Sequence, residues 1–166
     1  MTQSTETINN DLLHLTSFCN PQGRVLATAL IQTWNEAYYI ILSSDLTDDL
    51  ITCLSRYILR SKVCLSKEEI NIFGINVSKI NNSDQSLIQS KNQSLRPLAN
   101  DESRLILLSD LDEGKKFHTI NKEDWIIQDI NTGIPLISKI NSLKYIPQML
   151  NLDDLNAISF TKGCYT

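Results

Sequence analysis

At 166 residues the chain has the length of one ordinary domain, and 42% hydrophobic with 20% charged residues excludes a disordered or fibrous protein. A net charge of −4 argues against a broad nucleic-acid-binding surface. The polar N-terminus lacks the apolar core of a signal peptide, and no apolar run reaches the roughly 18 residues that span a membrane. We therefore expect a cytoplasmic protein with free thiols and with neither a membrane nor nucleic acid as a direct partner.

Residues 1–10 show no periodicity, and we expect them to be flexible. Two short apolar runs rich in β-forming residues follow, at 24–31 and 38–42. The dipeptide Asn35-Glu36 between them is typical of a turn, so the sequence predicts a β-hairpin.

The clearest helix signal comes next, because the apolar residues between 46 and 58 fall on one helical face. Ser44 or Asp45 is predicted to cap this helix, and two aspartates suit the positive end of its dipole. We expect an apolar stripe to pack on the sheet of the hairpin; it consists of Leu50, Cys53, Leu54 and Tyr57.

The second half predicts further strands at 62–65, 70–77 and 104–108, separated by a polar segment at 78–102 that is typical of a surface loop or an insertion. Asn121 is predicted to cap a second helix that ends at Gly133, with Trp125, Ile126 and Ile130 near its apolar side. Because strands and helices mix without strict βαβ alternation, the predicted class is α+β, with a mixed, largely antiparallel sheet and packed helices.

Four cysteines and two histidines are the candidate metal ligands, and their wide spacing matches no structural zinc pattern. Cys53 and Cys64 lie in apolar surroundings and are interpreted as core residues. His14 and His118 are interpreted as structural or surface residues. The sequence therefore gives no firm metal site.

The last residues of the chain, which we call the tail, contain a cysteine in a more distinctive pattern. They include Lys162-Gly163-Cys164-Tyr165. A glycine before a cysteine permits an unusual backbone angle, and a lysine two residues from a thiol can stabilise the thiolate. On the residues alone, a plain turn with an incidental cysteine is the more frequent arrangement, so both interpretations stay open.

These four residues resemble the opening of the K-G-C-Y-x-G-Q-E signature of the YgfZ family. Three other parts of the chain resemble segments of the same family in the same order. They are C-N-P-Q-G-R-V-L at 19–26, L-S-R-Y-I-L-R-S-K-V at 54–63, and G-I-P at 133–135 with I-P-Q-M-L-N-L at 146–152. The resemblance runs from about residue 10 to the end of the chain.

This resemblance implies part of the folate-binding fold that the family shares with the glycine-cleavage T-protein. Residues 11–166 would form an incomplete folate-binding domain, truncated at both ends and without the family's C-terminal β-barrel. The implied function is that of a folate-binding accessory factor in the assembly or repair of 4Fe–4S clusters in client enzymes, including a tRNA-thiomethylating enzyme.

The implied partners are tetrahydrofolate, iron–sulfur assembly proteins and the client enzymes. The signature cysteine would be Cys164, acting as a transient cluster ligand or in redox chemistry. On physical grounds, Lys162 and Arg24 are candidate partners for a folate carboxylate.

The alternative is a tetrahydrofolate-dependent aminomethyltransferase of the T-protein type. Aligning Gly23-Arg24 with the two glycines of the T-protein motif puts Ala27 and Thr28 at its two aspartates. Alanine cannot act as a base, and the stretch from Pro21 to Asn35 contains no acidic residue. We therefore expect no aminomethyl transfer, and a protein that is not an enzyme. A third alternative is that the chain has no activity by itself, because it would lack part of the family's cavity.

Overall fold

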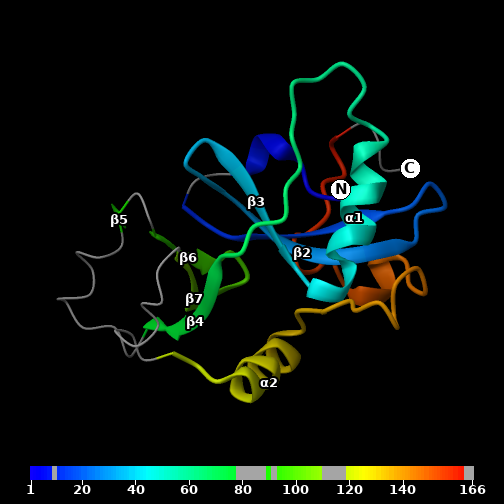
Figure 1. Ribbon diagram of the computed structural model, residues 1–166. Coiled ribbons are helices and arrows are strands. Elements are labelled where there is room, and N and C mark those ends of the chain that lie inside the picture. Colours follow the sequence, from blue (N-terminus) through cyan, green and yellow to red (C-terminus); the bar gives the residue numbers. More distant parts are fainter. Residues whose placement is uncertain (9–10, 78–88, 91–92, 110–118, 163–166) are drawn as a thin grey trace.

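The computed structural model describes residues 1–8, 11–77, 89–90, 93–109 and 119–162, which form two antiparallel sheets and two α-helices (Figure 1). The first sheet has the order β1-β2-β3, with β1 (His14–Cys19), β2 (Val25–Trp34) and β3 (Ala37–Leu42). The second has the order β4-β7-β6-β5, with β4 (Asn71–Asn76), β5 (Gln89–Ser90), β6 (Gln93–Leu98) and β7 (Asp101–Ser109). The predicted α+β class is confirmed.

The predicted hairpin is confirmed as β2 and β3, which pair from Trp34 opposite Ala37 onward. Asn35 and Glu36 have φ angles of 49° and 62°. Two consecutive left-handed residues give a tight loop whose twist matches that of the flanking strands.

Strand β1 was not predicted, and it pairs with β2 from His14 opposite Ile31 onward. Its apolar alternation is broken by Thr16 and Ser17, which are both buried. These two polar side chains face the N-terminal segment, because Gln3 N donates to Thr16 Oγ1 at 3.1 Å. The sequence pattern hides this strand because its buried positions are partly polar.

The N-terminus differs from the expected flexible segment, because Thr2 and Gln3 are buried. Thr2 N donates to the carbonyl of Ser17 at 2.7 Å, and Ser159 N donates to the carbonyl of Thr2 at 3.0 Å. The first residues therefore lie between β1 and the chain near residue 159. Asn9 and Asn10 lie outside the described residues.

The predicted first helix is observed as α1 (Thr47–Ser55), and it is shorter than predicted. Leu50 is buried against the sheet, whereas Cys53 and Leu54 are half-buried. The inward placement of Tyr57 was wrong, because the residue lies beyond the helix and is 68% exposed.

The predicted cap of α1 was also wrong, because Leu46 occupies the N-cap without a side-chain hydrogen bond. A short 3₁₀ helix, Ser44–Leu46, precedes α1 and takes up the two predicted cap residues. Asp45 instead contacts the segment that follows α2, because its Oδ2 accepts a hydrogen bond from Lys139 N at 2.9 Å.

In the second sheet, β4 and β7 confirm the strands predicted at 70–77 and 104–108. The strand predicted at 62–65 was wrong, and Cys64 in it is exposed rather than buried, because no strand among the described residues pairs with this stretch. The segment predicted as a loop contains β5 and β6, while its residues 78–88 and 91–92 lie outside the described part.

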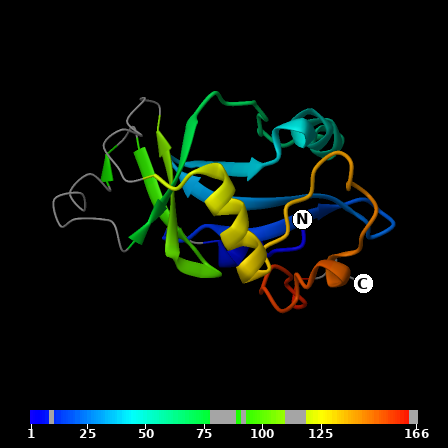
Figure 2. The same cartoon turned by 90° about the horizontal axis from the view of Figure 1, so that it is seen from below.

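Helix α2 (Lys122–Thr132) confirms the second predicted helix and both of its ends. Asn121 Oδ1 accepts from Asp124 N at 2.8 Å, and Gly133 closes the helix with a φ of 73°. Its apolar side is only partly covered, since Ile130 is 72% exposed. Figure 2 shows α2 lying across the junction of the two sheets.

The sheets join at Leu13, which is fully buried. Leu13 N donates to the carbonyl of Pro97, and Ala99 N donates to the carbonyl of Leu13, both at 2.9 Å. Leu13 packs in one cluster with Trp34, Leu98, Ile106 and Leu108. In the part of the chain that the structure describes, no helix is long and apolar enough to cross a membrane.

Candidate ligand-binding cavity

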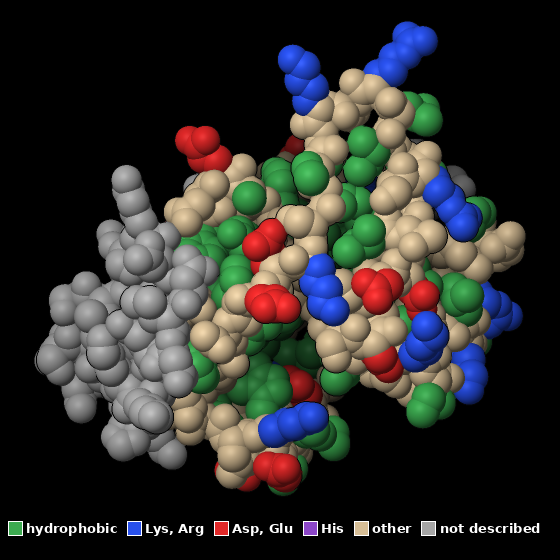
Figure 3. All heavy atoms as spheres, in the orientation of Figure 1, with side chains coloured by type: hydrophobic (Ala, Val, Ile, Leu, Met, Phe, Trp, Pro, Cys, Tyr) green, Lys and Arg blue, Asp and Glu red, His purple; other side chains and the backbone are tan. Residues whose placement is uncertain are grey.

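A cavity of about 490 Å³ lies between the two sheets and α2. Its wall draws on β1, β2, β3, β4, β6, β7 and α2, and on the segment 134–136 that follows the helix. Figure 3 shows a hollow with hydrophobic side chains on its walls beside α2. Its volume is within the range of roughly 300–1,000 Å³ that is usual for small-molecule sites.

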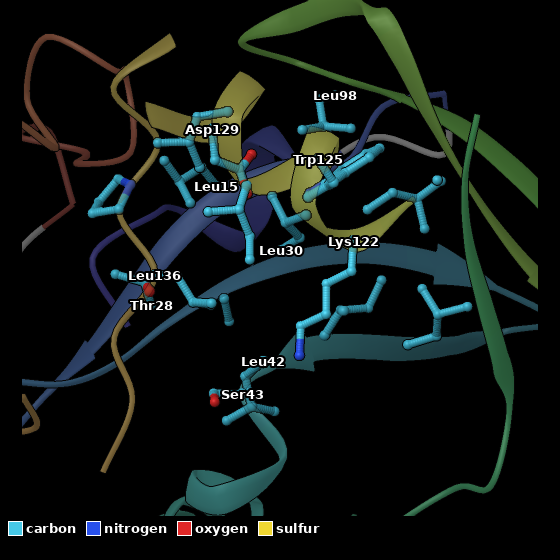
Figure 4. A pocket seen from close by; sticks show the side chains of 18 of the residues that line it. Leu15, Thr28, Leu30, Leu42, Ser43, Leu98, Lys122, Trp125, Asp129 and Leu136 are labelled. Atoms are coloured by element: carbon cyan, nitrogen blue, oxygen red, sulfur yellow. The ribbon is translucent and has the colours of Figure 1, made fainter. Parts of the chain in front are cut away.

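Most of the wall is aliphatic, and one aromatic ring, that of Trp125, contributes to it (Figure 4). The position of this ring depends on Gly74 in β4. A Cβ atom added at Gly74 would overlap Cε3 and Cζ3 of the indole. The glycine therefore lets β4 approach the ring closely.

Two charged side chains of α2 line the cavity, and they have opposite signs. Lys122 is the first residue of the helix, and Asp129 lies two turns further on. Figure 4 shows Lys122 extending from α2 toward the strands across the cavity, whereas Asp129 lies close to the helix. The site therefore combines apolar walls with one basic and one acidic group.

A fully buried arginine, Arg104 of β7, holds the acidic group in place. Its Nη1 donates to Asp129 Oδ1 at 2.6 Å, and its Nε donates to Asp101 Oδ2 at 2.7 Å. Its Nη2 donates to Thr132 Oγ1 at 3.1 Å, and its Cζ lies 4.7 Å from the ring centroid of Trp125. A buried guanidinium needs such partners, and here they fix one face of α2 against β7.

The two carboxylates around Arg104 have pKa values shifted in opposite directions. Burial raises the pKa of Asp129 above its usual value, although the hydrogen bond and charge of Arg104 oppose the shift. Burial also acts to raise the pKa of Asp101, but hydrogen bonds from Ser103 and Arg104 outweigh it and leave that pKa lowered. Of the two carboxylates, Asp129 is therefore the one that is protonated more readily.

The residues of β2 that the sequence analysis compared with the T-protein motif lie in different surroundings. Ala27 is fully buried in a cluster with Val25, Leu46 and Ile137, and it is not among the residues that line the cavity. Thr28 does line the cavity, and its Oγ1 accepts a hydrogen bond from Ile137 N at 2.9 Å.

Arg24 is exposed in the connection between β1 and β2, where its Nη1 donates to the carbonyl of Lys144 at 2.9 Å. It is not among the residues that line the cavity. Its predicted contact with a folate carboxylate stays a prediction.

Lys162 of the tail lies beside the N-terminus, where its Nζ donates to the carbonyls of Met1 and Gln3. Gly163, Cys164 and Tyr165 lie outside the described residues. Burial raises the pKa of the nearby Cys19 thiol above its usual value, although the hydrogen bond between Cys19 and Ser17 and the charge of Lys162 oppose this shift. Among the residues with a described position, no three His, Cys, Asp or Glu side chains gather as a metal site.

The charged residues of the cavity were not predicted from the sequence, although one signal was present. Lys122, Trp125 and Asp129 are spaced at i, i+3 and i+7, which places them on one helical face. The partners Asp101 and Arg104 come from a distant strand, so their role was not visible in the sequence.

Comparison with known proteins finds relatives that match most of the chain. The chain is 30% identical over 171 aligned positions to the "tRNA-modifying protein YgfZ" of Buchnera aphidicola subsp. Schizaphis graminum, covering 91% of this chain and 54% of that protein. It is 26% identical to the protein of the same name from Enterobacter sp. (strain 638), covering 92% of this chain and 53% of that protein.

An uncharacterized protein of Haemophilus influenzae is 31% identical over 156 aligned positions, covering 91% of this chain and 51% of that protein. No family model matches the chain. The chain thus spans about half the length of the curated relatives it matches.

Proposed function

This chain belongs to the YgfZ family, and from that premise we propose that it binds a reduced folate in the cavity between its two sheets. We further propose that it acts as a folate-binding accessory factor in the assembly or repair of 4Fe–4S clusters in client enzymes. A tRNA-thiomethylating enzyme is the proposed client, in keeping with the name of the relatives. Iron–sulfur assembly proteins would be its other partners.

The observation that carries the proposal is the composition of the cavity. Folate joins a flat heterocycle that carries N–H donors to a tail that carries carboxylates. Apolar walls and the Trp125 ring suit the heterocycle, and the cavity holds one carboxylate acceptor, Asp129, and one ammonium group, Lys122. The residues present therefore fit a folate in chemistry and in the volume available.

The proposed role in cluster maintenance involves Cys164. A 4Fe–4S cluster takes four ligands, so one thiolate could contribute only to a cluster shared with another protein. Lys162 comes two residues before this cysteine and is anchored to the N-terminal segment. We propose that this anchored tail presents Cys164 to a client or to an assembly protein.

Titration of the purified chain with tetrahydrofolate under anaerobic conditions tests the first part of the proposal. We expect saturable binding, detected by calorimetry and by a change in tryptophan fluorescence, because Trp125 lines the cavity. A Leu30→Trp variant should abolish binding by filling the cavity. Absence of binding by the wild-type chain at millimolar ligand would contradict the proposal.

Substitution of Cys164 tests the second part. In a bacterial strain that lacks its own YgfZ protein, the wild-type chain should restore tRNA thiomethylation, measured by mass spectrometry of digested tRNA. Cys164→Ser should restore none, because a hydroxyl is a far poorer metal ligand and redox group than a thiolate. Cys64→Ser, at an exposed thiol, is the matched control and should behave as wild type. Equal rescue by both variants would remove Cys164 from the mechanism.

A folate-dependent aminomethyltransferase is the second candidate, and one observation favours it. The cavity contains an acidic side chain, Asp129, although it comes from α2 rather than from the expected strand β2. Its ion pair with Arg104 and the presence of Ala27 and Thr28 on β2 count against a catalytic role. Formation of methylenetetrahydrofolate from an aminomethyl donor, lost in Asp129→Asn, would support the enzyme instead.

A further inference from the structure

We propose that Asp129 and Lys122 fix the orientation of the bound ligand, with its aminopyrimidine edge on Asp129 and its anionic tail at Lys122. This inference rests on the proposed function, since it assumes that a folate occupies the cavity. It assigns a recognition role to two residues and defines which end of the ligand each one contacts.

Three residues of α2 are arranged so that one extended ligand can contact them. Lys122, Trp125 and Asp129 all line the cavity from this helix. At 1.5 Å per residue, the two charged residues are separated by roughly 10 Å along the helix axis. Trp125 lies between them on the same face. A flat ligand that extends along the helix can therefore contact all three residues.

At the acidic end, Asp129 is half-buried, and its Oδ1 accepts a hydrogen bond from Arg104. The Trp125 side chain also hydrogen-bonds to this carboxylate. An ionised carboxylate has about four acceptor positions, so it retains capacity for a pair of N–H donors on the edge of an aminopyrimidine. A second carboxylate placed there would be repelled at short range in an apolar wall.

At the other end of the cavity-facing side of α2 lies a basic group. Of the described residues that line the cavity, Lys122 is the one cationic side chain. The guanidinium of Arg104 cannot replace it, because it is fully buried, does not line the cavity, and already donates to Asp101, Asp129 and Thr132. A tail carboxylate is therefore stabilised at Lys122 and destabilised at Asp129, and the reversed orientation loses both interactions.

Two ligands that differ only in the tail test the orientation. Tetrahydrofolate carries the anionic p-aminobenzoyl-glutamate tail, and 6-methyltetrahydropterin has the same reduced pterin without any carboxylate. Lys122→Gln should weaken tetrahydrofolate binding about three- to five-fold, as expected for an exposed ion pair, and leave 6-methyltetrahydropterin binding unchanged. Lys144→Gln, at an exposed lysine that does not line the cavity, should change neither affinity.

Asp129→Asn should weaken both ligands equally, by at least about ten-fold, because the lost hydrogen bonds belong to the part that they share. Thermal unfolding of this variant shows whether it retains its fold. If Asp129→Asn does not fold, Lys122→Gln still tests the orientation, because Lys122 is exposed and its substitution should not affect folding.

The outcomes separate the two proposals. Failure of the wild-type chain to bind either ligand would overturn the proposed function itself. If the wild-type chain binds both ligands, the Lys122→Gln variant decides the orientation. An unchanged affinity for tetrahydrofolate, or an equal loss of affinity for both ligands, would overturn the orientation alone. Loss of tetrahydrofolate binding alone in a folded Asp129→Asn variant would indicate the reversed orientation.

Discussion

Arg104 links the stability of the molecule to the shape of its cavity. Its guanidinium is completely buried and bonds two carboxylates and a hydroxyl, while its charge lies over the Trp125 ring. Local sequence rules predicted Arg104 only as part of an apolar strand, because the partners that define its role lie up to 28 residues away. Recognition of such a residue required the tertiary structure.

Replacing this arginine should therefore be severely destabilising. Arg104→Met removes the partner of two carboxylates, and we expect a loss of about 3–5 kcal/mol in the free energy of unfolding, measured by urea denaturation. Arg56→Met, at an exposed arginine just after α1, is the control and should change it by less than about 0.5 kcal/mol. Similar losses in the two variants would contradict the importance of the buried network.

The lowered pKa of Asp101 gives a pH dependence with a defined sign. A carboxyl whose pKa is lower in the folded state contributes stability above its unfolded pKa of about 3.9, and this contribution is lost as the pH falls through the folded pKa. Asp101→Asn should therefore be less stable than wild type at neutral pH, and the difference should shrink in acid. A difference that stays constant from pH 7 to pH 2 would contradict this linkage.

At the scale of elements, the sequence predicted those turns and helix ends that depend only on residues close together in the chain. The hairpin at Asn35 and Glu36, the cap at Asn121 and the end at Gly133 all depend on neighbouring residues, and all were predicted. The strand predicted around Cys64 failed for the opposite reason, since a β-forming sequence makes a strand only where a partner strand is available.

Contact between β4 and α2 gives a test at this scale. Gly74→Ala should displace the Trp125 ring, because the added methyl group overlaps the indole. We expect a loss of about 1–3 kcal/mol and a shift in tryptophan fluorescence. In a Trp125→Leu background the same substitution should have a smaller effect, because the overlapping ring is absent. An equal loss in both backgrounds would show that the close contact is not the cause.

At the scale of the whole molecule, both the cavity and the N-terminal contacts join segments that are distant in sequence. The cavity draws on residues from Leu15 to Leu136, and its shape could not be deduced from any one motif. The tail motif was recognised from its sequence, yet Gly163, Cys164 and Tyr165 lie outside the described residues, so their predicted role stays a prediction. What the structure adds is the surroundings from which that tail emerges.

Those surroundings depend on Thr2, a buried residue that joins the two ends of the described chain. Its Oγ1 donates to the carbonyl of Ala157 at 2.7 Å and accepts from Ser17 N at 2.9 Å. Thr2→Val keeps the shape but leaves both backbone groups unpaired, so we expect a loss of about 1–3 kcal/mol. Hydrogen–deuterium exchange should rise at residues 157–162, whereas Thr5→Val, at an exposed threonine, should leave it unchanged. Unchanged exchange in Thr2→Val would mean that the tail is held in place without this residue.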